Sequence, residues 1–233
     1  MENLVRVKWN RLKSNLTLSE IAFYIKSNKY SEELGYGYSD FELSSEALSA
    51  TYTEAKLNKQ TSVDPLGNEN EQEFITYESI QFSISKLIGR LYLLSVYNPP
   101  KSIKSLTERL SADSGYKIGF GIVDIKLSEY LGSLRERYDL DLISIKKVKV
   151  SNLIVNDNSK ATVEVTSKKN AFDDVKDIIG DKAYTLDKVR AAGYVLGHRC
   201  EFEISKNGSV CANEGMVKYL TETIVSHILE REI

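Results

Sequence analysis

The sequence predicts an α+β fold, with a curved, mainly antiparallel sheet and helices packed on one of its faces. Runs in which apolar and polar residues alternate recur along the chain, as in strands with one buried face. Other stretches repeat apolar residues every three or four positions, which is typical of amphipathic helices. Short turns join most of the strand-like runs and favour antiparallel pairing. The pattern also allows two related lobes.

Strands dominate residues 1–95. The run NLVRVKWNRL alternates and predicts a first strand, and Thr17 with Glu20 has the spacing of a capping box before a helix. The Gly/Tyr-rich segment ELGYGYSD predicts a loop. Residues 50–63 and 72–85 flank a turn containing Asp64-Pro65 and Gly67-Asn68, which predicts a long antiparallel hairpin. The apolar run RLYLLSVY predicts the strand that closes this region.

Residues 96–233 predict an α+β region, which could also continue the first region as one domain. Asn98 before Pro99 predicts an N-cap followed by the first residue of a helix. The remaining pattern predicts, in order, a buried strand in YKIGFGIVDI, a helix at 127–138, a hairpin at 141–167, a short helix after Asn170, strands at 183–195 and 198–205, a hairpin at SKNGSVCAN and a final helix from about Met216.

Composition excludes several classes of function. The net charge of −2 gives no global basic field, so binding to nucleic acid requires a local patch. No run of 18 apolar residues predicts a membrane span, and the N-terminus lacks the apolar core of a signal peptide. We therefore expect a cytoplasmic protein without membrane partners, in which the two cysteines are reduced.

The sequence contains no assembled catalytic set, metal site or cofactor motif. Gly115, Gly119 and Gly121 resemble a phosphate loop, but Asp124 occupies the position where a dinucleotide fingerprint requires a third glycine. His198 and Cys200 lack an orienting third group for nucleophilic catalysis, and with Cys211 they lack zinc-ligand spacing.

Three carboxylate/lysine pairs keep a divalent-metal-dependent nuclease open as an alternative, because such an enzyme needs carboxylates and a lysine at a sheet edge. Such pairs arise commonly in strands whose exposed face alternates charge, and this is the interpretation that the sequence favours. The pairs are Glu54/Lys56, Asp124/Lys126 and Glu203/Lys206.

The densest basic run is SIKKVKV. Strand alternation places Lys147 and Lys149 on one face and Lys146 on the other. This run could contact phosphates from a sheet, or it could protect a strand edge from aggregation.

The last third of the chain resembles one lobe of the TATA-box-binding-protein fold, over residues ~145–231. VKVSNLIV is similar to the family segment in which an Asn lies on the DNA-facing sheet, here Asn152. FEISKNGSVCAN is similar to a family hairpin whose following Thr meets the minor groove, and Asn213 falls near that position. Ser205 stands where a family wedge residue would be Phe, so the resemblance implies the fold more than TATA recognition.

Together these observations predict a non-catalytic binding module that binds DNA or RNA through an exposed sheet face, with Lys147, Lys149, Asn152 and Asn213 as contact residues. Protein–protein interaction or self-assembly is the main alternative. Tyrosine is favoured at protein interfaces, and the chain has candidates in Tyr36, Tyr38, Tyr52 and Tyr77.

Overall fold

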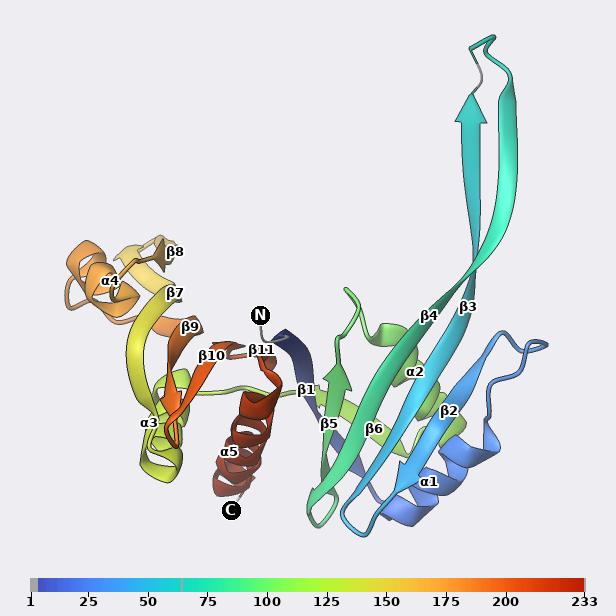
Figure 1. Ribbon diagram of the computed structural model, residues 1–233, viewed down its shortest axis with the longest axis horizontal. Helices are drawn as coiled ribbons and strands as arrows, with labels where there is room; N and C mark the ends of the chain where they lie inside the picture. The colour runs from blue at the N-terminus through green and yellow to red at the C-terminus, as the bar shows by residue number, and fades with distance from the viewer. Residues whose placement is uncertain (1–3, 64, 233) are drawn as a thin grey trace. The chain divides into compact units, whose positions relative to one another are not determined.

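The computed structural model describes residues 4–63 and 65–232 and confirms the predicted α+β class (Figure 1). Asn3 of the first predicted strand and Asp64 of the predicted hairpin turn lie outside the described residues. Contacts within the chain divide it into two compact units. Unit 1 comprises Met1–Arg11, Leu87–Gly89 and Gly121–Ile233, and unit 2 comprises Leu12–Lys86 and Arg90–Phe120.

Unit 2 is a sheet covered by two helices. Its strands lie in the order β2-β3-β4-β5, and both β2–β3 and β3–β4 pair antiparallel. The chain enters it at the end of β1 and leaves it within β6. The elements that lie wholly or partly in unit 2 are β1 (Leu4–Ser14), α1 (Leu18–Ser27), β2 (Tyr36–Leu43), β3 (Ala47–Val63), β4 (Glu69–Ile88), β5 (Leu91–Tyr97), α2 (Lys104–Asp113) and β6 (Ile118–Ile122).

The two helices of unit 2 begin differently. α1 follows the predicted capping box: Glu20 N–H donates to Thr17 Oγ1 at 3.2 Å, and Thr17 N–H donates to the Glu20 carboxylate at 2.7 Å. The predicted start of α2 at Asn98 is wrong, because α2 begins at Lys104. Asn98 instead has a φ of 44°, a left-handed conformation that asparagine tolerates in turns.

The prediction that ELGYGYSD forms a loop is also wrong from Tyr36 onward, because strand β2 begins at that residue. Gly37 is in this strand because the backbone of Tyr30 passes close by. A Cβ at Gly37 would lie 2.4 Å from the Tyr30 backbone. Here glycine marks close backbone approach within a strand rather than a loop.

The core of unit 2 lies between its sheet and its helices. Apolar residues of α1 and α2 contact inward-facing residues of β2, β3, β4 and β5. The largest side chains in this core include Tyr52, Phe82, Leu48 and Ile80, all almost fully buried. Tyr38 and Tyr52, two of the predicted interface tyrosines, are thus core residues, whereas Tyr77 is exposed.

Unit 1 is a second antiparallel arrangement of strands with three helices. The first residues of β1 pair with β11, and the order continues as β1-β11-β10-β9-β7-β8. The remaining elements are α3 (Leu127–Tyr138), β7 (Asp141–Asn156), β8 (Ser159–Thr166), α4 (Ala171–Ile179), β9 (Thr185–Val195), β10 (His198–Ser205), β11 (Ser209–Asn213) and α5 (Glu214–Glu232).

The strands of unit 1 have one apolar face and one polar face. Val148, Val189, Ile204 and Val210 point into the core, and most alternate residues on the same strands are partly or fully exposed, although Ser205 is buried. Helix α4 packs against the apolar side of the β7–β8 hairpin through Val175 and its neighbours. The face opposite the core is therefore the polar one, as the sequence pattern predicts.

Candidate functional site

A polar face on the sheet of unit 1 brings together basic residues from distant parts of the sequence. Cross-strand register aligns two neighbouring rows of side chains over six strands, and residues directly opposite one another share a face. The first row comprises Arg6, Cys211, Glu203, Arg190, Lys147 and Thr166, and the second comprises Lys8, Ser209, Ser205, Lys188, Lys149 and Glu164. We call these two rows the polar face.

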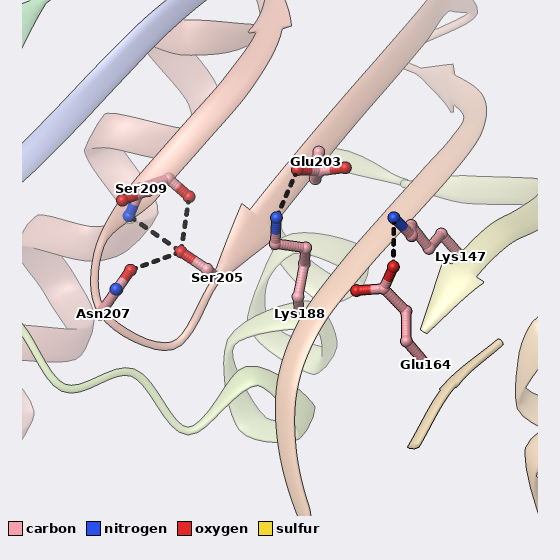
Figure 2. A network of polar contacts seen from close by, with 7 residues as sticks. All are labelled: Lys147, Glu164, Lys188, Glu203, Ser205, Asn207 and Ser209. Carbon is pink, nitrogen blue, oxygen red and sulfur yellow. Dashed lines mark hydrogen bonds and ion pairs between the residues drawn. The ribbon is translucent and has the colours of Figure 1, made fainter. Parts of the chain in front are cut away.

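Ion pairs hold the carboxylates of the polar face against its basic side chains (Figure 2). Lys147 Nζ lies 2.6 Å from Glu164 Oε1, and Lys188 Nζ lies 2.9 Å from Glu203 Oε1. The hydrogen bond from Lys147 lowers the pKa of the Glu164 carboxyl below its ordinary value. Glu164 is therefore ionised at neutral pH, and the charge count of the polar face includes both carboxylates.

Basic side chains outnumber acidic ones on the polar face, six against two. Lys149 forms no ion pair or side-chain hydrogen bond with any residue in the described ranges. Excess positive charge on a surface concentrates anions around it even when the whole chain is nearly neutral. The polar face is thus a local basic patch on a chain whose net charge is −2.

One end of the second row is fixed by the turn between β10 and β11. Ser205 Oγ donates to Asn207 Oδ1 at 2.6 Å and accepts from Ser209 N–H at 3.2 Å (Figure 2). Lys8 Nζ donates to the Asn207 carbonyl at 2.6 Å, and burial lowers the pKa of Lys8. Lys8 is therefore a positioned cation, whereas Lys149 is available to a ligand.

The basic run does not protect a strand edge, because β7 lies between β8 and β9. The expectation that Lys146 faces away from Lys147 is also wrong. A register shift between Ile145 and Lys147 interrupts the alternation, and Lys146 Nζ lies 3.2 Å from Glu201. Glu201 also binds Arg190, so Lys146 extends the ion-pair network beside the polar face.

Asn152 lies on the same strand but in an irregular segment. Its φ is 56°, and the pairing of β7 with β8 shifts register between Val150 and Leu153. The exposed side chain donates from Nδ2 to Thr185 Oγ1 at 3.1 Å. Asn152 thus lies further along β7 than the second row, with one of its two amide N–H groups engaged by Thr185.

Asn213 lies apart from the lysines, at the end of β11 and beside a cleft of about 470 Å³. Its Oδ1 accepts from Glu201 N–H at 2.7 Å. His198, Arg199 and Cys200 also line this cleft. Burial raises the pKa of the Cys200 thiol, the opposite of what a nucleophilic cysteine requires.

The carboxylate/lysine pairs are engaged in other contacts. Lys56 pairs with Glu78 at 2.5 Å, and Lys206 pairs with Asp187 at 2.6 Å. Glu203 holds Lys188, as described above. Within residues 4–63 and 65–232, no three His, Cys, Asp or Glu side chains are placed to hold a metal ion together.

Four basic residues of the polar face were not predicted from the sequence: Arg6, Lys8, Lys188 and Arg190. Lys188 and Arg190 alternate with buried Val189 and Ala191, so their spacing does place them on the outer face of a strand. What the sequence does not contain is the register that aligns them with Lys149 and Lys147. That register depends on bulges in β7, which local alternation cannot locate.

The fold and the polar face define an α+β protein with a charged, open sheet surface. No family model and no curated protein sequence matches the chain. Among solved structures, the chain is similar to DynU16, a protein in the dynemicin biosynthetic locus, with 11% identity over 94% of this chain and 93% of that chain. The TM-score is 0.20, so this match carries no argument about fold or function. No helix in the described part of the chain is long and apolar enough to cross a membrane.

Proposed function

We propose that this protein is a nucleic-acid-binding module that contacts the phosphate backbone through the polar face. The observation that carries the proposal is the excess of basic side chains on one solvent-facing sheet surface in a chain of net charge −2. Half or more of protein–DNA hydrogen bonds go to phosphate and sugar, chiefly from lysine, arginine and small polar side chains. The polar face offers these residue types.

The same residues predict little sequence preference. Neither row contains an aromatic side chain on which a base could stack, and Tyr194 lies on this side of β9 only at the strand's end. Ser205 stands where the TATA-box-binding family has a wedge, so insertion between base pairs is not expected. The family resemblance supports a sheet that binds nucleic acid and does not extend to kinking of DNA.

Fluorescence anisotropy with labelled duplex and single-stranded DNA and RNA tests the proposal. We expect binding that weakens steeply between about 50 and 200 mM salt, because phosphate contacts release counterions. Lys149→Glu should weaken binding to every sequence and lower the slope of log affinity against log salt by about 1. Lys101→Glu, a charge reversal at an exposed residue of unit 2, is the matched control.

Absence of binding at both salt concentrations, or equal binding by Lys149→Glu and the unaltered protein, would contradict the proposal. A parallel reaction with Mg²⁺ tests the nuclease alternative, because cleavage of the labelled strand would reveal it directly. Asn152→Ala and Asn213→Ala then test the two remaining predicted contacts. We expect Asn152→Ala to weaken binding only slightly, since its amide is already hydrogen-bonded.

A further inference from the structure

The distal part of the β3–β4 hairpin is a two-stranded arm without a covering layer (Figure 1). The arm consists of residues 55–63 and 69–77, whose register runs from Ala55↔Tyr77 to Val63↔Glu69. β2 reaches only as far as Glu54, and every described arm residue is exposed or only partly buried. An isolated two-stranded hairpin is marginally stable in water, so a partner surface would stabilise this one.

One side of the arm carries a compact apolar patch near its base. Leu57 and Ile75 are direct cross-strand neighbours, and Tyr77 follows on the same side two residues along β4. Their exposed fractions are 62%, 57% and 62%. Exposed apolar side chains gathered on one side mark an interaction surface more often than scattered ones do.

The same side of the arm becomes acidic toward its tip. Lys59 neutralises Glu73, with Nζ and Oε1 2.6 Å apart. Glu71 and Glu69 follow on this side, and within the described ranges neither forms an ion pair or side-chain hydrogen bond. The arm therefore presents apolar contact area followed by two unpaired carboxylates.

We infer that the arm docks on the polar face of a second copy of this chain. Glu69 and Glu71 are two residues apart on a strand, as are Lys147 and Lys149, so both pairs repeat at about 7 Å. Opposite charges at equal spacing can pair when the arm lies along β7, where Lys149 has no ion-pair partner and Lys147 is shared with Glu164. The aliphatic stems of the lysine and arginine side chains, together with Tyr194, offer cover for Leu57, Ile75 and Tyr77.

Each copy contains one arm and one polar face. Two copies can therefore exchange arms, and a dimer in which both contacts form would have two-fold symmetry. This inference does not depend on nucleic-acid binding. If the polar face also binds nucleic acid, the arm and the phosphate backbone compete for the same lysines.

Sedimentation velocity with charge-reversal variants tests the inference. The unaltered chain should dimerise at about 50 mM salt and dissociate as salt rises, because exposed charges are screened. Glu69→Lys/Glu71→Lys and Lys147→Glu/Lys149→Glu should each raise the dimer dissociation constant about tenfold or more, because each places like charges together. Combining all four changes in one chain should restore the dimer.

Glu42→Lys/Glu46→Lys is the matched control, since both residues are exposed and lie outside the arm. It should leave the dimer unchanged, and circular dichroism should show each variant folded. A monomeric unaltered chain, a dimer insensitive to the arm substitutions, or no recovery in the four-residue variant would overturn the inference. Because anisotropy measures nucleic-acid binding separately, failure of one proposal is distinguishable from failure of the other.

Discussion

Lys147 on β7 and Glu164 on β8 are diagonal cross-strand neighbours, and their Nζ and Oε1 atoms are 2.6 Å apart. The Lys147 hydrogen bond lowers the pKa of Glu164, so this carboxylate stays ionised below the pH at which an ordinary glutamate protonates. The ion pair is complete above the ordinary glutamate pKa and is lost as pH falls through the lowered one. We expect Lys147→Gln to raise the Glu164 pKa in an NMR titration, and no change in that pKa would contradict the contact.

The two partners of this ion pair should affect polyanion binding in opposite directions. Glu164→Gln removes a negative charge from the polar face and should strengthen nucleic-acid binding at low salt. Lys147→Gln removes a positive charge and should weaken it. Anisotropy at about 50 mM salt measures both, and effects of the same sign would show that charge on this face does not govern binding.

A pH-dependent stability effect is expected in unit 2, at Asp113. Tyr38 OH donates to Asp113 Oδ2 at 3.0 Å, but burial raises the pKa of Asp113 above 3.8 despite this bond and nearby Arg109. The folded state then binds a proton more tightly than the unfolded state. Stability must therefore fall as pH rises from 3.8 through the raised pKa.

Asp113→Asn keeps an oxygen that can accept from Tyr38 and removes the carboxylate. Its melting temperature should equal or exceed that of the unaltered chain at neutral pH and lose this advantage in acid. Thermal melts of both proteins between acid and neutral pH measure the difference in melting temperature. An advantage that grows as pH falls would reverse the sign and refute the assignment.

Tyr130 joins helices α3 and α5 through a fully buried hydrogen bond. Its OH donates to the Leu220 carbonyl at 2.7 Å, whereas Tyr138 on the same helix reaches Glu222 nearer the surface. We expect Tyr130→Phe to lower the free energy of unfolding by about 0.5–1.5 kcal/mol, since a buried bond is lost. Tyr138→Phe is the control with little effect, and equal losses by urea denaturation would argue against the buried bond.

How far the sequence predicts this fold depends on whether the signal is local. The capping box at Thr17 involves residues within one turn, and it was predicted correctly. Asn98 and Gly37 were misread because each residue type has two uses. Asparagine caps helices but also adopts positive φ, and glycine breaks strands but also permits close backbone approach.

For the polar face, too, the sequence predicts what depends on local residues and misses what depends on contacts between distant segments. Lys147 and Lys149 could be named as candidates from the sequence because they form a dense run within a single strand. Lys188 and Arg190 join them only through pairing of β7 with β9, and Arg6 and Lys8 join from the opposite end of the sequence. Pairing between distant strands is set by tertiary packing, which no local pattern contains.

The turn at Gly208 connects stability to the polar face. Gly208 has a φ of 78°, and an added Cβ would lie 2.9 Å from the Trp9 carbonyl oxygen, beside the bond from Trp9 N–H to Gly208 O at 2.8 Å. Gly197 has the same φ, but an added Cβ would meet nothing within 4 Å. Alanine at either position bears the left-handed backbone strain of about 1–2 kcal/mol, and at Gly208 it also displaces β1.

We therefore expect Gly208→Ala to lower the free energy of unfolding more than Gly197→Ala, as measured by urea denaturation. Gly208→Ala should also weaken nucleic-acid binding, because Lys8 is held by the carbonyl of Asn207 in the same turn. Gly197→Ala, in the turn between β9 and β10, should leave binding unchanged. Equal destabilisation by the two substitutions would show that the close approach of Trp9 to Gly208 does not constrain this turn.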